Sequence, residues 1–234
     1  MPRLAIIDAL RGVALLLMFA YHFCFDLNYY GFTHFDFNHD SFWLSARSVI
    51  VSLFLLLVGI SLQLANAHGI RWHSVWRRLL MLAAAAGGVT IASAMLFPNS
   101  YIFFGILHFI AVASLLGLAF LRYRWLALFA GIGLLWLGLG FSDPLFNRPP
   151  FQWIGLMTYK PITEDYVPLL PWFGVVLLGI FVGSCLPTVG GKFASWQGTA
   201  GAWPLLRLAG RHSLLLYLIH QPILLALLYL ITLL

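Results

Sequence analysis

The sequence predicts an all-α integral membrane protein, a single polytopic bundle of about seven transmembrane helices spanning residues 1–234. Two features of its composition support this fold class: 62% of the 234 residues are hydrophobic and only 9% are charged, whereas soluble domains carry about 25% charged residues. The mean hydropathy is +0.94. Uncharged stretches of the length that crosses a bilayer, ~20 residues, also recur along the chain. So little charge cannot cover a water-soluble surface, and we expect membrane lipid around the bundle.

Six uncharged stretches are the expected later spans: 48–67, 79–97, 100–121, 125–142, 167–186 and 213–234. The first helix differs, because its uncharged core, 12–25, has only fourteen residues. It reaches spanning length only if 4–7 are included, which places Asp8 and Arg11 inside the helix. Together these segments give seven spans.

The distribution of charge predicts the orientation. Ten of the 13 Lys and Arg residues fall on the side of the N-terminus, including Arg3 and Lys192, while Arg47, Arg148 and Lys160 fall on the other side. Because Lys and Arg are retained in the cytoplasm, we expect the N-terminus inside and the C-terminus outside. The cations are scattered between apolar runs rather than clustered as on a phosphate-binding face, so nucleic acid is not an expected partner.

Three connections are long. The loops 27–43 and 143–166 are expected outside, and 187–211 inside with a short interfacial helix. Long ordered loops in compact domains are usually functional. Gly179 and Gly183 form a small-xxx-small pair that predicts close helix packing, and a homodimer face is possible there.

A polar stripe follows one face of the first helix. Asp8, Arg11, His22 and Asp26 recur at spacings of three and four, so they share that face. We expect Asp8 to pair with Arg11, and His22 with Asp26, each about one turn apart. Ionisable residues inside a membrane usually face a cavity or a partner, although contact between helices is the alternative. A carboxylate beside an imidazole makes a workable general base.

Other histidines lie near the expected outer side or within helices. His39 stands beside Asp40 in the first outer loop, and His108 and His220 are expected roughly 10 Å from the ends of their helices at 1.5 Å per residue. A metal site needs several ligands at short spacing. The sequence has no such cluster, so no metal is expected.

Several motifs resemble those of the heparan-α-glucosaminide N-acetyltransferase family, in its small bacterial branch. They are the opening Asp8-x-x-Arg11-Gly12, the apolar run ending in His22 and Asp26, and the closing stretches 210–214 and 220–222. The resemblance implies an acyl-CoA-dependent transmembrane acyltransferase of the bacterial inner membrane. It would move an acyl group, expected to be acetyl, from cytosolic acetyl-CoA or another acyl-CoA to a hydroxyl or amine acceptor. The acceptor, a small molecule or a glycan, would lie at the periplasmic face.

The resemblance also implies which residues carry the reaction. Lysosomal members use a histidine just before the second helix, a setting that 39–42 fits here, and they carry Asn late in the first helix where this chain has His22. The catalytic candidates are His39 and His22 as base, with Asp26 or Asp40 as orienting group, and His39 is the favoured base. Candidate substrate-binding residues are Asp8, Arg11, Arg47, Tyr101, His108, Glu164, Asp165 and His220.

Two other classes of function compete with acyl transfer. A transporter or flippase could use the same polar stripe as a substrate path, but its hallmarks, repeats or broken helices in matching halves, are missing from the sequence. A non-catalytic membrane scaffold would leave the charges inside the first helix unexplained.

Overall fold

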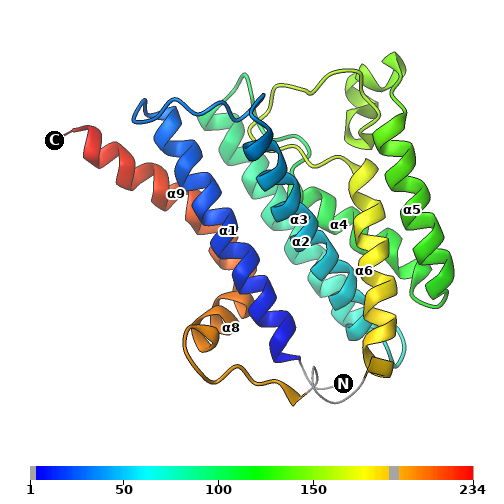
Figure 1. Cartoon of the computed structure of the whole chain (residues 1–234). Coiled ribbons are helices and arrows are strands. Elements are labelled where there is room, and N and C mark those ends of the chain that lie inside the picture. Colours follow the sequence, from blue (N-terminus) through cyan, green and yellow to red (C-terminus); the bar gives the residue numbers. More distant parts are fainter. Residues whose placement is uncertain (1–3, 190–194, 234) are drawn as a thin grey trace. The chain divides into compact units, whose positions relative to one another are not determined.

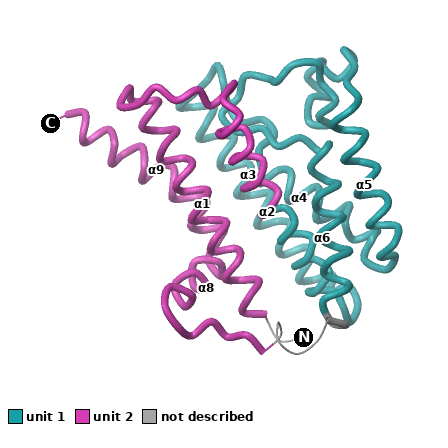
Figure 2. The backbone as a smooth tube through the Cα atoms, viewed as in Figure 1, with its two compact units in different colours: residues 1, 55–189 teal, residues 2–54, 190–234 magenta. Residues whose placement is uncertain are grey.

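The computed structural model describes residues 4–189 and 195–233. Arg3 and Lys192, two of the cations used to predict the orientation, lie outside the described residues. The chain divides into two compact units (Figure 2): unit 1 holds residues 55–189, and unit 2 holds residues 2–54 and 190–234.

The predicted all-α class is confirmed, since the described residues form helices and no strand (Figure 1). The helices are α1 (Ala5–Tyr29), α2 (Ser41–Ala65), α3 (Trp72–Leu96), α4 (Ile106–Gly117), α5 (Arg124–Gly140), α6 (Leu169–Val189), α8 (Trp203–Arg211) and α9 (Ser213–Thr232). Short 3₁₀ helices are η1 (Leu118–Phe120), η2 (Pro144–Asn147) and η3 (Pro149–Ile154). Helix α8 is the short helix expected within 187–211. Helix α1 includes Asp8 and Arg11, as expected for a first helix long enough to span the bilayer.

Five helices are long and apolar enough to cross a membrane: α1, α2, α3, α6 over Leu169–Leu186, and α9. The other two apolar helices are shorter, at Ile106–Phe120 and Arg124–Gly140, so the prediction that seven segments reach full length holds for five. The expected span 100–121 loses its start because Asp165 Oδ2 accepts a hydrogen bond from the Ile106 N–H at 2.8 Å. Phe104 also forms an isolated β-bridge with Tyr166. These contacts fix the residues before Ile106 outside the helix.

Small residues bring the helices of unit 1 together, as the Gly179–Gly183 spacing predicts. A Cβ on Gly179 would lie 2.3 Å from the carbonyl oxygen of Leu56, and one on Gly59 would lie 2.1 Å from that of Val176. The backbones of α2 and α6 therefore meet with no room for a side chain. Helices α5 and α6 meet in the same way, where a Cβ on Gly174 would lie 2.6 Å from the Gly131 oxygen.

We expect Gly179→Ala to destabilise unit 1, because its methyl group would overlap the Leu56 carbonyl and overpacking costs about 1–3 kcal/mol. Gly87→Ala is the matched control, since a Cβ there meets no atom within 4 Å. The thermal unfolding midpoint of the purified protein in detergent should fall for Gly179→Ala and stay level or rise for Gly87→Ala. Equal midpoints for Gly179→Ala and the wild type would contradict the packing described.

Candidate functional site

The carboxylate of Asp8 joins the two ends of unit 2. Asp8 is only 2% exposed. Its Oδ1 lies 2.9 Å from Arg11 Nη1, and its Oδ2 lies 3.5 Å from Arg211 Nε, at the end of α8. The predicted pairing of Asp8 with Arg11 is confirmed, and Arg211 is a third member that the sequence pattern did not reveal. Two guanidinium groups therefore offset one buried carboxylate.

Two glycines allow α1 and α8 to come this close (Figure 1). A Cβ on Gly12 would lie 2.0 Å from the Leu206 oxygen, and one on Gly210 would lie 1.8 Å from the Asp8 oxygen. Arg11 Nη1 also donates to the Gly210 carbonyl at 3.2 Å. The opening and closing motifs thus meet in one contact, which we call the Asp8 clasp: Asp8, Arg11, Gly12, Gly210 and Arg211.

Two histidines meet between α1 and α9. His220 Nε2 lies 3.3 Å from His22 Nδ1, which also lies 3.1 Å from the Met18 oxygen. His220 Nδ1 lies 2.6 Å from the Tyr217 oxygen. Carbonyl oxygens only accept, so each Nδ1 carries the proton, and the lone pair of His220 Nε2 faces the His22 N–H. In this arrangement His22 Nε2 is left as an acceptor.

Asp26 lies one turn after His22 but pairs with α9 instead. Gln221 Nε2 donates to Asp26 Oδ1 at 2.7 Å, and Asp26 is 1% exposed. The expected pairing of His22 with Asp26 is therefore wrong. The reason is directional: side chains in a helix point back toward its N-terminus, and the His22 ring turns toward Met18, away from Asp26.

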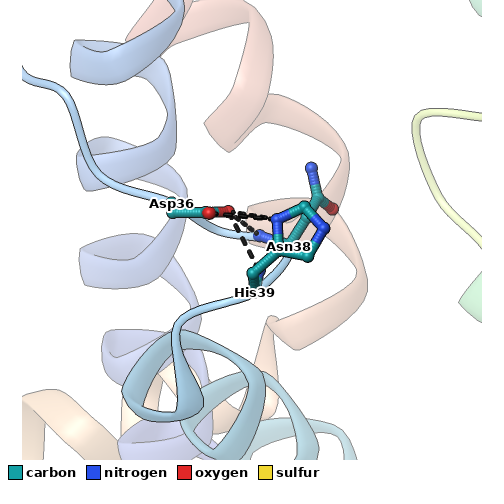
Figure 3. A network of polar contacts seen from close by, with 3 residues as sticks. All are labelled: Asp36, Asn38 and His39. Carbon is teal, nitrogen blue, oxygen red and sulfur yellow. Dashed lines mark hydrogen bonds and ion pairs between the residues drawn. The ribbon is translucent and has the colours of Figure 1, made fainter.

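His39 pairs with Asp36 rather than with Asp40 (Figure 3). Its Nδ1 lies 3.0 Å from Asp36 Oδ2. The Asn38 and His39 backbone N–H groups donate to Asp36 Oδ1 at 3.0 and 2.9 Å. These backbone hydrogen bonds, followed by that of the His39 ring, lower the pKa of Asp36 below its ordinary value. The expectation that Asp40 orients His39 is wrong, because Asp40 Oδ1 accepts from the Phe42 N–H at 2.8 Å, at the start of α2.

The loop that carries His39 is fixed to α1 through Phe37. This ring is 5% exposed, and its centroid lies 5.5 Å from that of Tyr21, 5.2 Å from that of Phe25 and 4.3 Å from that of Trp43. The positive charge of Arg47, a candidate substrate-binding residue, acts on the Tyr21 hydroxyl. Aromatic packing therefore holds the loop, while the His39 side chain stays 85% exposed and open to a ligand.

The candidates in unit 1 organise the start of α4. Glu164 accepts a hydrogen bond from the Ser100 hydroxyl, and Asp165 accepts from the Ile106 N–H. The backbone oxygen of Tyr101 accepts from the Thr163 hydroxyl at 2.8 Å. These three hydrogen bonds join the segment before α4 to the loop before α6.

His108 lies in the first turn of α4, so its expected depth of about 10 Å is wrong. Its Nδ1 accepts from the Gly105 N–H at 3.3 Å, and its Nε2 lies 3.1 Å from the Thr90 hydroxyl. That hydroxyl donates to the Ile102 oxygen at 2.7 Å. Nearby, burial raises the pKa of Tyr166 to about 12. The histidine is fully engaged in holding the segment before α4.

A shallow hollow of about 740 Å³, open to the surface, lies in unit 1 where α5 begins. Its lining combines cations, aromatic rings and neutral polar groups: Gln63, Leu121, Arg122, Tyr123, Arg124, Trp125, Leu126 and Ser184. The Arg124 guanidinium lies 5.4 Å from the Trp125 ring centroid, a cation–π distance.

The residues that the structure describes contain no group of three His, Cys, Asp or Glu side chains placed to hold a metal ion. Within the described part of the chain, neither Cys24 nor Cys185 takes part in a disulfide, and the two belong to different units. That the protein works without a metal stays a prediction.

The Asp8 clasp yields a prediction about stability. Asp8→Ala should lower the free energy of unfolding by about 3 kcal/mol, because removing one partner of a buried ion pair strands the other charge. Arg11→Ala should cost less in the Asp8→Ala background than in the wild type, since the pair is coupled. Thermal unfolding of the four proteins in detergent measures this double-mutant cycle. Strictly additive effects would show that the two side chains do not stabilise each other.

Comparison with known protein families matches residues 3–222 to the model described as "Heparan-alpha-glucosaminide N-acetyltransferase, catalytic". No curated protein and no solved structure matches the chain. The match takes in α1 with its clasp, the His39 loop, both histidines between α1 and α9, and all of unit 1. The family carries out acetyl transfer in a membrane setting, which agrees with the apolar helices found here. The chain belongs to the heparan-α-glucosaminide N-acetyltransferase catalytic domain family.

Proposed function

We propose that the protein transfers an acetyl group from cytosolic acetyl-CoA, or another acyl group from its CoA thioester, to an acceptor at the periplasmic face. The membrane would be a bacterial inner membrane, crossed with the N-terminus in the cytoplasm. The acceptor is a hydroxyl or amine of a small molecule or glycan. Membership of the family supports acetyl transfer, and the uneven distribution of Lys and Arg supports the orientation.

The contact between Asp36 and His39 is the observation on which the choice of base depends. The Asp36 carboxylate accepts hydrogen bonds from two backbone N–H groups, and it also accepts one from the Nδ1–H of His39. A carboxylate in this position fixes the tautomer and leaves Nε2 as a proton acceptor. The exposed imidazole in the loop before α2 also has the setting of the family histidine. We therefore assign His39 as general base and Asp36, in place of Asp40, as the group that orients it.

The proposed reaction is an acyl transfer in which one proton passes from the acceptor, through His39, to the departing sulfur. The acceptor oxygen or nitrogen attacks the thioester carbonyl, and His39 Nε2 takes the proton of the attacking group. The new C–O or C–N bond forms, the C–S bond breaks, and the departing sulfur of coenzyme A receives the proton from His39. The base is neutral again at the end of the cycle.

The cavity in unit 1 suits the nucleotide end of the donor. Arg122 and Arg124 supply positive charge, and Trp125 supplies an aromatic face. In the proposed orientation both arginines are cytoplasmic, on the side where acyl-CoA is made. Asp8 and Arg11 then have a structural role, since the clasp occupies their charged groups.

Exchange of His39 tests the proposal. His39→Ala should lower the rate of coenzyme A release by about 10²–10⁴, the usual contribution of a general base, with acetyl-CoA affinity unchanged. The assay is thiol release by the purified protein in liposomes, with acetyl-CoA and glucosamine as probes. Asp36→Asn should also slow release, because the amide keeps the backbone contacts of the turn but loses the negative charge beside the imidazole.

Two matched controls accompany these variants. His34→Ala removes another exposed histidine of the same loop, and Asp40→Asn keeps an oxygen to accept from the Phe42 N–H. Both should retain wild-type release. If His39→Ala keeps full turnover, or if Asp40→Asn slows it as much as Asp36→Asn does, the assignment of base and orienting group is overturned.

A further inference from the structure

A small hollow of about 100 Å³ lies in unit 1 and shares no lining residue with the hollow at the start of α5. Its polar side chains come from the connection between α2 and α3, from the start of α3 and from α4. They are Asn66, Arg71, Ser74, Arg78 and Ser114. We call this site the α3 hollow, and the proposed reaction does not use it.

A buried hydroxyl without a partner lines the α3 hollow. Ser114, on α4, is 4% exposed, and its Oγ is buried with no hydrogen-bond partner. Ser93, which is also buried, differs: its hydroxyl donates to the Thr90 oxygen at 3.1 Å and accepts from the Ile102 N–H at 3.0 Å. Burying an unpartnered hydroxyl is costly. A ligand seated in the α3 hollow supplies the partner that Ser114 lacks within the protein.

The charge of the α3 hollow is positive. Arg71 and Arg78 line it, and the described lining includes no Asp or Glu. Arg71 Nη2 donates to the Ala65 oxygen at a long 3.4 Å. Within residues 4–189 and 195–233, no carboxylate forms an ion pair with the Arg71 guanidinium. Because arginine has five N–H donors, Arg71 can also bind an anion.

Helix α3 begins beside the hollow and adds to the positive potential. Its N-cap, Arg71, makes no side-chain capping hydrogen bond, and its first turn holds no acidic residue. The first N–H groups of a helix have no partner within the helix and carry partial positive charge. Ser74 and Val75, at this end of α3, line the hollow. Together with Arg71 and the Ser114 hydroxyl, this helix end favours a bound anion.

The size and surroundings of the α3 hollow select the kind of anion. Its volume of about 100 Å³ compares with about 30 Å³ for one molecule of liquid water, so it accommodates a phosphate group and not a nucleotide. The rest of its lining is apolar and includes Leu62, Val75 and Leu79. Trp72 and Trp76, on the same end of α3, are 54% and 53% exposed. Exposed tryptophans are typical of the membrane–water interface, where basic pockets between helices bind lipid head groups.

We propose that the α3 hollow binds a phosphate group, and its surroundings favour an anionic phospholipid over a soluble phosphate ester. Arg71 and the Ser114 hydroxyl donate to the phosphate oxygens, and the glycerol end of the lipid lies against the apolar lining. This site depends neither on the acetyl transfer proposed above nor on the base assigned to it. Variants of the α3 hollow should therefore keep the wild-type affinity for acetyl-CoA.

The test uses the full-length protein in phosphatidylcholine nanodiscs with increasing fractions of phosphatidylglycerol. Phosphatidylglycerol should raise the thermal unfolding midpoint of the wild type. Arg71→Gln and Ser114→Ala should each raise the fraction needed for half of this effect about fivefold or more, because each removes a hydrogen bond to a charged group. In pure phosphatidylcholine, Ser114→Ala should unfold at the wild-type midpoint or above, since it removes an unpartnered buried hydroxyl.

Arg77→Gln is the matched control for charge. It removes the same charge from the same end of α3, but Arg77 does not line the α3 hollow. This variant should keep the full response to phosphatidylglycerol.

A further arm identifies the source of the phosphate. Glycerol 3-phosphate is added to phosphatidylcholine discs, with acetate as the control anion. Stabilisation by this ester, but not by acetate, assigns the site to a soluble phosphate ester. Stabilisation by phosphatidylglycerol alone assigns it to a lipid.

Four results would each overturn the proposal. They are no effect of either phosphate compound, equal responses of Arg71→Gln and Arg77→Gln, an undiminished response in Ser114→Ala, and a loss of acetyl-CoA affinity in Arg71→Gln. The last result would make the α3 hollow part of the donor site.

Discussion

Charged side chains within apolar helices must find their partners inside the protein, because lipid tails offer no hydrogen bonds. In unit 2 this constraint falls first on Asp8, whose carboxylate is closed off by Arg11 and Arg211. Gly12 and Gly210 let the two backbones approach closely enough for that contact. The clasp therefore explains why charges and glycines occur together in the motifs at both ends of the chain.

The partners of the ring nitrogens distinguish structural histidines from candidate catalytic histidines. His108 has both ring nitrogens engaged within unit 1, so it holds the start of α4. His39 is exposed, with one nitrogen fixed by Asp36 and the other facing solvent. His22 and His220 differ from both, since they contact each other between α1 and α9, with His220 Nε2 3.3 Å from His22 Nδ1.

The sequence predicted the helices and the polar face of α1 well, because hydropathy and helical periodicity are local properties. It could not predict the partners that α1 finds: His220 and Gln221 lie 198 and 195 positions from His22 and Asp26, and no spacing rule links them. The sequence points to Asp40 rather than Asp36 as the partner of His39, because adjacency in sequence says little about a turn, where residues three apart can meet. The late start of α4 depends on Asp165, 59 positions from Ile106.

In the proposed reaction, the acetyl group passes from a donor on one side of the membrane to an acceptor on the other. Proteoliposomes with an amino-sugar oligomer sealed inside and radiolabelled acetyl-CoA outside test it directly. We expect label to accumulate on the enclosed oligomer while intact acetyl-CoA stays outside, and we expect His39→Ala to prevent this. Labelling only when donor and acceptor share a compartment, or protein-dependent entry of intact acetyl-CoA, would contradict it.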